Sequence, residues 1–368
     1  MLESVRILLL ADTHIGFDLP ARPRIVRRRR GHDFLANYDR ALAIAHEGRV
    51  DMVVHGGDVF HRSRIPASTA WQGLDPLVRV ADKGIPVFVV PGNHERSRLP
   101  HSPLARHPGI HVFDRPRTFV KEVRGCRIAL AGFPFVRGDI RSQFRDVLAA
   151  TEWHNKQSDI RLLCLHQCVE GATVGPATFT FTTGPDVIRA RDLPHDLAAV
   201  LSGHIHRQQV LKRDLAGRPL KTPVAYPGSI ERTSIAEKDE AKGFMIVEVV
   251  PSGPPRFEFR PLPARPMMVR ELPVDGLGER ELEMQLRNLL ASLPSDAVLR
   301  LLVSGEPVGE ARRMVSAEFL RDIAPTTMNV DVMTADGIRA SRRKRSRARK
   351  ETLELPFPSS PWDHPPQG

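Results

Sequence analysis

The sequence has few cysteines, no long hydrophobic run and no internal repeat. Three cysteines among 368 residues do not suggest a disulfide framework, and they favour a reducing, cytoplasmic setting. No apolar run approaches the roughly 20 residues that cross a bilayer. The apolar run at residues 7–11 lacks the cleavage-site pattern of a signal peptide. The sequence therefore predicts a cytoplasmic protein that does not bind a membrane.

The chain carries an excess of positive charge. Its formal net charge is +11, with 54 lysines and arginines against 43 acidic residues. One basic cluster occupies residues 22–30, and a second lies between Arg339 and the C-terminal end of the sequence. The first cluster consists of Arg22, Arg24, Arg27, Arg28, Arg29 and Arg30. Such clusters indicate a polyanionic partner, although either one alone is also typical of a solvated loop or tail.

The length and the residue pattern divide the chain into two folded regions and a tail. Residues 1–255 alternate short apolar runs with segments of helical spacing, which predicts a layered α/β fold. Residues 256–336 contain neither histidine nor cysteine and predict a small α+β domain with the order strand, helix, strand, helix, strand. Residues 337–368 are rich in arginine and lysine and then in proline, which predicts disorder.

Two details of the first region have alternative interpretations. The segment 67–84 has helical character and ends in a glycine, but Pro76 is a candidate break in that helix. Cys164 and Cys168 lie on either side of His166 and could bind zinc, although packing in the core is the interpretation that we favour for both cysteines.

Side chains that can bind metals follow five of the predicted strands. In "AAVLSGHIH", an apolar run gives way to His204 and His206, which face the same side of an extended backbone because they are two residues apart. "LADTH" repeats this spacing with Asp12 and His14. The candidates after the other strands are Asp58, His61, Asn93, His94 and His166. Loops beyond the strand ends of such folds gather around ligands, so we expect these side chains to meet.

These donors are too numerous for a single ion. One metal takes roughly four to six ligands, whereas the five loops supply nine candidate residues. Two ions that share a bridging carboxylate account for the number, and such a pair suits in-line displacement at phosphorus. Gly57, Gly92 and Gly203 stand beside the donors, where tight turns and close approach of the backbone favour glycine. Each motif alone could consist of ordinary loop residues. Five such motifs, each at the end of an apolar run, are poorly explained in that way.

In this order, the motifs "ADTH", "GGDVF", "PGNHE", "HQ" and "GHIH" resemble the calcineurin-like metallophosphoesterase superfamily, over roughly residues 5–250. Three longer segments are similar to segments of the SbcD-type DNA repair nucleases: "GDVFHRSR", "LHQCVEGATVGP" and "YPGSIERTSIAEKDEAKGF". The Arg-rich loop and the appended small domain are similar as well. The resemblance implies a layered metallophosphoesterase fold, with β-sheets flanked by helices, and a small capping domain.

The resemblance also implies roles for the motif residues. It implies two divalent ions, with Mn²⁺ favoured, and Asp58 as the bridge between them. The ligands of the first ion would be Asp12, His14 and His206, and those of the second would be Asn93, His166 and His204. His94 resembles the catalytic histidine that stabilises or protonates the leaving oxygen. His61 would help to orient the phosphate, although it could also be an ordinary loop histidine.

The function that these observations predict is a Mn²⁺-dependent DNA exonuclease of DNA repair that is also a candidate single-strand endonuclease. The small domain would help to hold DNA, and the arginines at residues 22–30 would contact its phosphates. The resemblance implies an SbcC-like coiled-coil ATPase as partner, and a homodimer is a further expectation. One alternative is a dimetal phosphatase or nucleotidase that acts on small phosphoesters. The other is a non-catalytic clamp for an ATPase, against which the intact donor set argues.

Overall fold

The computed structural model describes residues 4–20, 27–100, 107–251 and 253–334. The chain divides into a first unit up to Arg265 and a second unit from Pro266 onwards. This division lies later than the predicted one after residue 255, because β16 (Arg256–Pro261) pairs with β15 (Gly243–Val249) of the first unit. The predicted tail, 337–368, lies outside the described residues. Within the described part, none of the helices is both long and apolar enough to cross a membrane.

The first unit contains two six-stranded sheets. In spatial order, the first sheet consists of β16, β15, β1 (Val5–Leu10), β2 (Met52–His55), β3 (Val87–Val89) and β4 (Ile110–Val112). The second consists of β13 (Gln209–Arg213), β14 (Pro219–Tyr226), β12 (Ala199–Ser202), β7 (Ile160–Leu165), β6 (Cys126–Gly132) and β5 (Arg117–Val123). Strands β1 to β4 run parallel, and so do β14, β12, β7 and β6. Each parallel set therefore presents its carboxyl ends at one edge of its sheet.

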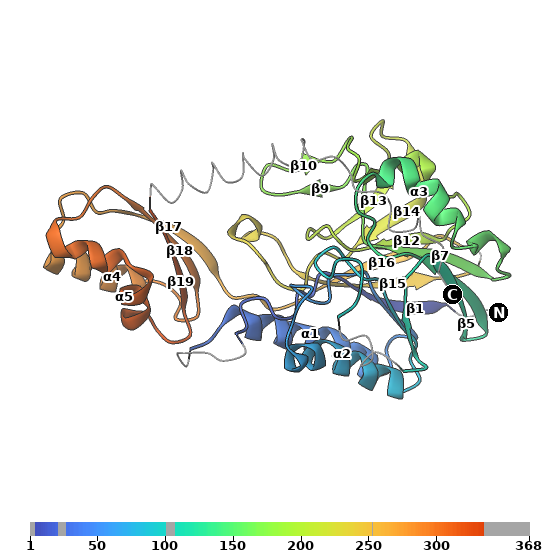
Figure 1. The fold of residues 1–368 in the computed structure, drawn as a ribbon, viewed down its shortest axis with the longest axis horizontal. Helices are drawn as coiled ribbons and strands as arrows, with labels where there is room; N and C mark the ends of the chain where they lie inside the picture. The colour runs from blue at the N-terminus through green and yellow to red at the C-terminus, as the bar shows by residue number, and fades with distance from the viewer. Residues whose placement is uncertain (1–3, 21–26, 101–106, 252, 335–368) are drawn as a thin grey trace, which may run out of the picture. The chain divides into compact units, whose positions relative to one another are not determined.

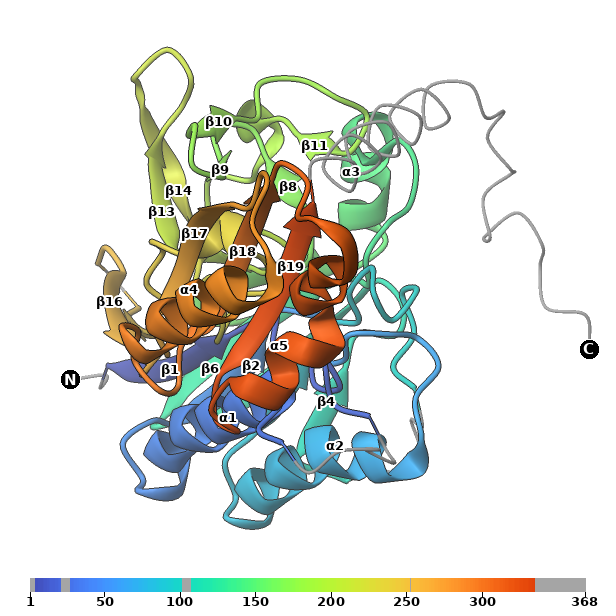
Figure 2. The same cartoon turned by 90° about the vertical axis from the view of Figure 1, so that its left-hand side faces the viewer.

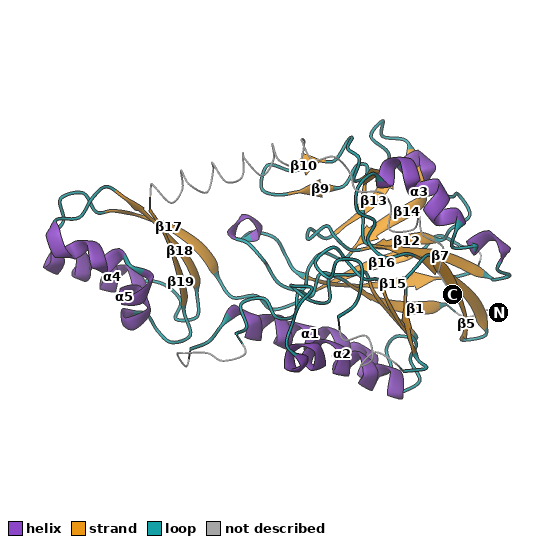
Figure 3. Cartoon of the chain, in the orientation of Figure 1, coloured by secondary structure: helices purple, strands orange, loops and turns teal. Residues whose placement is uncertain are grey.

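Three helices cover the outer faces of these sheets, as Figures 1 and 3 show. They are α1 (Arg30–His46), α2 (Ala67–Asp82) and α3 (Ile140–Ala149). Alternation along β1 explains the layering, because Leu8 and Leu10 pack with α1 and α2 while Ile7 and Leu9 pack between the sheets. The outer face of the second sheet packs against α3. The predicted layered α/β fold, with sheets flanked by helices, is confirmed.

Short elements complete the first unit. The remaining strands are β8 (Cys168–Val169) with β11 (Val187–Ile188), and β9 (Thr173–Val174) with β10 (Phe179–Thr180). Three 3₁₀ turns are η2 (Trp153–Asn155), η3 (Ala190–Asp192) and η4 (Ile235–Glu237).

The helix predicted over residues 67–84 is confirmed as α2, and Pro76 does not break it. A proline inside a helix removes one backbone hydrogen bond and crowds the preceding turn. Here Pro76 is buried on the same apolar face as Leu74 and Leu77. The contacts of this face with the first sheet stabilise the helix through the proline, and α2 continues to Asp82.

The second unit is built on a parallel three-stranded sheet with its own apolar core. Its strands are β17 (Met267–Pro273), β18 (Val298–Ser304) and β19 (Asn329–Thr334), and its helices are α4 (Glu279–Ala291), α5 (Ala317–Ile323) and the 3₁₀ segment η5 (Gly309–Val315). Figure 2 shows α4 and α5 lying over one face of this sheet. Leu299, Leu301 and Val303 alternate toward the helices, and the elements follow one another in the predicted order.

Candidate metal centre

The predicted ligands stand directly beyond the carboxyl ends of parallel strands of both sheets. Strand β1 ends two residues before Asp12, β7 ends just before His166, and β12 ends two residues before His204. Hydrogen bonds tie these ends together across the two sheets. The His166 Nδ1 donates to the Gly56 carbonyl at 2.8 Å, and the His204 amide donates to the Asp12 carboxylate at 3.1 Å. The two sheet edges thus form one site.

Four of the predicted ligands adopt backbone conformations that side chains other than glycine rarely take. Asp12, His14, Asp58 and His204 all have positive φ, between 44° and 82°. Such residues cost of order 1–3 kcal/mol each and persist where the surrounding structure holds them. The chain turns sharply after each strand, and that turn directs these side chains into the site.

Glycines make room for the donors at two of these turns. A side chain at Gly92 would overlap the carboxylate of Asp58, and one at Gly203 would overlap the Gly56 carbonyl group. Neither clash can be relieved by the far end of a flexible side chain, because the obstructing atoms belong to a ligand and to the backbone. The expectation that Gly92 and Gly203 allow close approach agrees with this geometry.

The first donor group brings together Asp12, His14 and His206, whose ligand atoms all lie within 4.8 Å of one another. The Nε2 atoms of His14 and His206 are 3.1 Å apart, and the His206 Nε2 is 3.7 Å from the Asp12 Oδ1. Asp12 and His14 are fully buried. The three residues come from loops after β1 and β12, almost two hundred residues apart in sequence.

The second donor group is centred on the amide oxygen of Asn93. The His166 Nε2 lies 2.9 Å from the Asn93 Oδ1, and the His204 Nδ1 lies 3.1 Å from the same atom. The sequence predicted these three residues as the ligands of one ion, and the structure places their donor atoms side by side.

Asp58 lies between the two groups. Its Oδ2 atom is 3.9 Å from the His14 Nε2 of the first group and 3.5 Å from the His166 Nε2 of the second. Its other oxygen, Oδ1, accepts a hydrogen bond of 2.9 Å from the His94 amide. A carboxylate in this position can contact two ions at once, which is the place that the predicted bridge requires.

The donor set fits divalent ions. Metal–ligand bonds of about 2.1 Å place adjacent ligand atoms about 3.0–3.4 Å apart. The closest pairs here, at 2.9, 3.1 and 3.1 Å, lie close to that range. Imidazole nitrogens with carboxylate and amide oxygens form the mixed N/O set that suits Mn²⁺ or Zn²⁺. The cluster is therefore able to hold metal ions.

Protonation in the metal-free site is divided among the donors. Burial lowers the pKa of His204 to about 3 and that of His14 well below its usual value, so both rings are neutral and able to bind a metal. Burial also opposes a charge on His166, but the charges and hydrogen bonds around it, Asp58 first, raise its pKa to about 9. For Asp58, burial raises the pKa, but the charge and hydrogen bond of His166 together with the charges of His14 and His94 outweigh burial and lower it.

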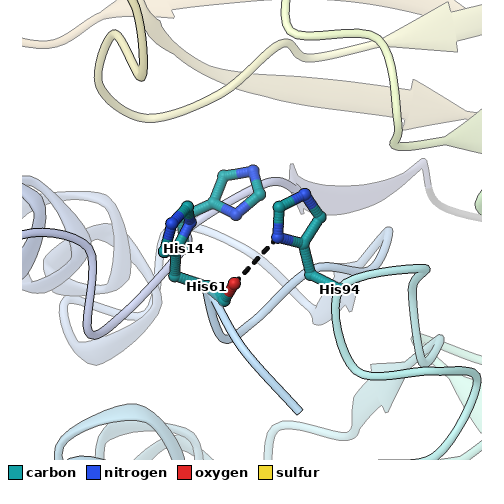
Figure 4. A group of neighbouring side chains, drawn as sticks. All are labelled: His14, His61 and His94. Carbon is teal, nitrogen blue, oxygen red and sulfur yellow. Dashed lines mark hydrogen bonds between the residues drawn. The ribbon is translucent and has the colours of Figure 1, made fainter. Parts of the chain in front are cut away.

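His94 and His61 lie beside the predicted ligand His14 (Figure 4). The His94 Nδ1 donates to the His61 carbonyl at 2.8 Å, which leaves its Nε2 facing the site, 3.9 Å from the Asp58 Oδ2. The His94 side chain is 35% exposed, whereas Asp58 is buried. Burial, His94 and Arg62 lower the pKa of His61 to about 4, so this ring is neutral at physiological pH. His14, His61 and His94 also form a group that could hold an ion.

Two further acidic residues, to which the sequence analysis gave no role, lie next to the predicted ligands. Glu95 is buried and accepts hydrogen bonds from the amides of Phe60 and Gly92, which joins the loops that carry Asp58 and Asn93. Burial raises the pKa of Glu95 to about 8. Glu237 faces His206. Glu95 stands directly after His94 in "PGNHE", beyond the apolar run of β3, so the local pattern could have indicated it, whereas Glu237 in "SIAEKDEAKGF" does not follow an apolar run.

The predicted phosphate-contacting arginines are only partly described, because Arg22 and Arg24 lie outside the described residues. Arg27 begins the described part of the cluster. The following three contact groups of their own chain: Arg28 pairs with Asp33 at 2.6 Å, Arg29 pairs with Asp18, and Arg30 lies over the Phe17 ring. Contact with a substrate therefore remains a prediction for this cluster.

The cysteines belong to the core. Cys126, Cys164 and Cys168 are all buried, and burial raises the pKa of the Cys164 and Cys168 thiols. Among the described residues, the groups able to hold a metal include no cysteine. Packing, the interpretation that we favoured, agrees with these observations.

The chain is similar to known proteins. The family model for calcineurin-like phosphoesterases matches residues 5–208. The chain is 26% identical over 243 residues to the DNA double-strand break repair protein Mre11 of Thermoplasma acidophilum, a match of 64% of this chain and 58% of that protein. It is 26% identical over 301 residues to a subunit of the nuclease SbcCD of Bacillus subtilis. This match covers 75% of this chain and 74% of that protein. The solved structure of a dimetal phosphatase from Danio rerio matches with a TM-score of 0.42 and 11% sequence identity. This match covers 67% of this chain and 92% of that one. The chain thus spans less than two thirds of the archaeal relative.

Proposed function

The chain belongs to the calcineurin-like phosphoesterase family, and from this premise we propose that it is a DNA repair nuclease that hydrolyses phosphodiesters with two divalent ions. The observation that carries the proposal is the position of Asp58, within 4 Å of a donor nitrogen in each of two separate groups. The names of the archaeal and bacterial relatives support DNA as the substrate. The mixed N/O donor set is compatible with Mn²⁺, the ion that the family resemblance favours.

The predicted ligands would bind two ions. Asp12, His14 and His206 would hold one ion, Asn93, His166 and His204 the other, and Asp58 both. Bound ions supply charge neutralisation at the phosphate and a water of lowered pKa. The protein contributes rigid placement, because the ligands stand on turns that are fixed by the two sheets.

His94 is the residue that we assign to proton transfer. Its Nδ1 hydrogen is held by the His61 carbonyl, so protons enter and leave at Nε2. That atom faces the site, and the ring is partly exposed, so a leaving oxygen can reach it. Protonation of the leaving group at this position is general acid catalysis. His61, with a neutral ring beside His94, would orient the phosphate by hydrogen bonding.

The test compares substrate classes with the purified full chain. With Mn²⁺, we expect degradation of linear duplex DNA from its ends, loss of activity in chelator, and loss in Asp58→Ala. Circular single-stranded DNA in the same assay tests endonuclease activity. Rapid hydrolysis of mononucleotides together with intact linear DNA would contradict the proposal and favour the small-phosphoester phosphatase, because the same metal chemistry serves both.

The partners are part of the same proposal. The Bacillus subtilis relative is named as a subunit, which supports a second subunit for this chain, and we propose a coiled-coil ATPase of the SbcC type. Replacing Arg27, Arg28, Arg29 and Arg30 with alanine tests whether this cluster contacts DNA. Each lost phosphate contact reduces the slope of log affinity against log salt by nearly one unit. Light scattering of the purified chain tests the expected homodimer.

A further inference from the structure

The segment at residues 227–242, "PGSIERTSIAEKDEAK", supplies none of the predicted ligands, yet it packs against one of them. The Ser229 amide donates to the carbonyl of His206 at 3.1 Å. A side chain at Gly228 would collide with the same carbonyl group. Glu237 and Lys242 are buried in this segment, although neither would bind a metal in the roles described above. The burial of two opposite charges beside a ligand needs a separate explanation.

The side of the His206 ring that faces away from the donors meets only hydrogen-bond acceptors. The His206 Nδ1 is 3.2 Å from the Thr233 hydroxyl and 3.4 Å from the Glu237 Oε1. The Thr233 hydroxyl donates its hydrogen to the Glu237 Oε1 at 2.7 Å, so its oxygen is left to accept. The hydrogen of the neutral ring therefore lies on Nδ1. The lone pair lies on Nε2, which faces the Nε2 of His14 at 3.1 Å and the Asp12 Oδ1 at 3.7 Å.

Lys242 fixes the carboxylate that faces this ring. Its side chain is fully buried, and its Nζ lies 2.6 Å from the Glu237 Oε2 and 3.0 Å from the Glu240 Oε2. The same Nζ donates to the His206 carbonyl at 2.8 Å. A buried ammonium group is tolerated only with such partners. Lys242 therefore joins the acceptor behind the imidazole ring to the backbone of the same histidine, so both the ring and the main chain of His206 are held.

We propose that Glu237, held by Lys242, is a positioning residue that fixes the orientation and tautomer of His206 for metal binding. The inference rests on the metal centre of the proposed function and concerns one of its two donor groups. Histidine ligands in metal sites commonly donate their second ring hydrogen to a carboxylate, and loss of that partner lowers metal affinity by about 10–100-fold. The His166 ring of the other group already has its own acceptor, the Gly56 carbonyl.

The experiment titrates the metal-free full chain with Mn²⁺ alone, with free Mn²⁺ followed by electron paramagnetic resonance and the heat by calorimetry. For Glu237→Gln we expect one of two sites to weaken by about 10–100-fold while the second site keeps its affinity. The matched control is Asp239→Asn, which makes the same change in charge on an exposed carboxylate of the same segment that pairs with Lys238 and not with Lys242. We expect this control to bind both ions with wild-type affinity.

A second variant tests the same link without a change in charge. Thr233→Val removes the hydroxyl group between His206 and Glu237, and we expect weakening of the same site by a smaller factor. Thermal melting of each metal-free variant shows whether it folds. Wild-type affinity at both sites in folded Glu237→Gln, or in Thr233→Val if the first variant does not fold, overturns the inference and leaves the metal centre standing. A wild-type chain that binds no Mn²⁺ overturns the metal centre itself and the inference with it.

Discussion

The two units of the chain differ in where their backbone is strained. Among the described residues of the first unit, ten residues other than glycine have positive φ, and four of these are predicted metal ligands. Within residues 266–334 of the second unit, positive φ occurs only at Gly276, Gly305 and Gly309. The second unit therefore meets its turns with glycine and stabilises its sheet by ordinary packing. The first unit accepts strain at Asp12 and its neighbours because their side chains must reach a common point.

The largest effect is expected from a substitution at the centre of the candidate metal site. Replacing Asp58 with alanine removes the carboxylate that lies between the two donor groups, and two bound cations would then repel each other across a short gap. We expect loss of both ions and of all hydrolysis, measured by metal analysis and with a chromogenic phosphodiester. Asp146→Ala, at an exposed position of α3, is the matched control. Two ions retained in Asp58→Ala would refute the bridge.

The next effect separates chemistry from metal binding within the same site. His94→Ala removes the partly exposed ring whose Nε2 faces the donors. We expect two bound ions, normal DNA binding and a decrease in cleavage of roughly 10²–10⁴-fold, because a general acid is lost. If the metal content falls in parallel with the activity, His94 is instead a ligand, as its proximity to His14 and His61 would allow.

A core substitution in the second unit tests whether its stability comes from packing and is independent of the metal centre. Leu301 is fully buried between β18 and the helices. Leu301→Ala should lower the free energy of unfolding of that unit by about 2–5 kcal/mol, since it leaves a cavity. Metal content and hydrolysis of a small phosphodiester should remain at the wild-type level. Chemical denaturation followed by circular dichroism gives the stability. A loss of bound metal would show that the two units are not independent in this respect.

A pair of glycine substitutions tests the same contrast with a single methyl group. Gly92→Ala should weaken metal binding and destabilise the first unit by about 1–3 kcal/mol, because the new Cβ overlaps Asp58. Gly278→Ala in the second unit meets no atom within 4 Å and should change stability by no more than about 1 kcal/mol. Calorimetric Mn²⁺ titration and thermal melting measure both variants. Equal effects at the two positions would contradict the contrast.

The smallest expected effect concerns an exposed ion pair of the second unit. Arg300 pairs with Asp331 on neighbouring strands at 2.6 Å, and Asp331 is largely exposed. Arg300→Ala should change the free energy of unfolding by no more than about 1 kcal/mol, because water screens such pairs. Denaturation at low and high salt measures the change. A larger loss that persists in high salt would mean that the pair is packed more tightly than its exposure indicates.

The sequence by itself determined the layered α/β character of the fold and which residue types stand at the ends of its main strands. The runs that form β1, β7 and β12 are apolar, and each stops within two residues of a predicted ligand, so the local pattern indicated candidate donors and the family resemblance implied their roles. The local pattern left open whether Pro76 breaks its helix, because local propensity does not include the packing of a buried face.

Only the tertiary structure decided which donors meet and what holds them. His14 and His206 are separated by 192 positions, and their nitrogens come within 3.1 Å because the carboxyl ends of strands from two sheets converge at one site. The place of Asp58 between the groups, and the support of His206 by Glu237 and Lys242, follow from the same convergence. The reason is physical: residue type and spacing along the chain control neighbours within a few residues, whereas contacts between distant loops depend on strand order and packing.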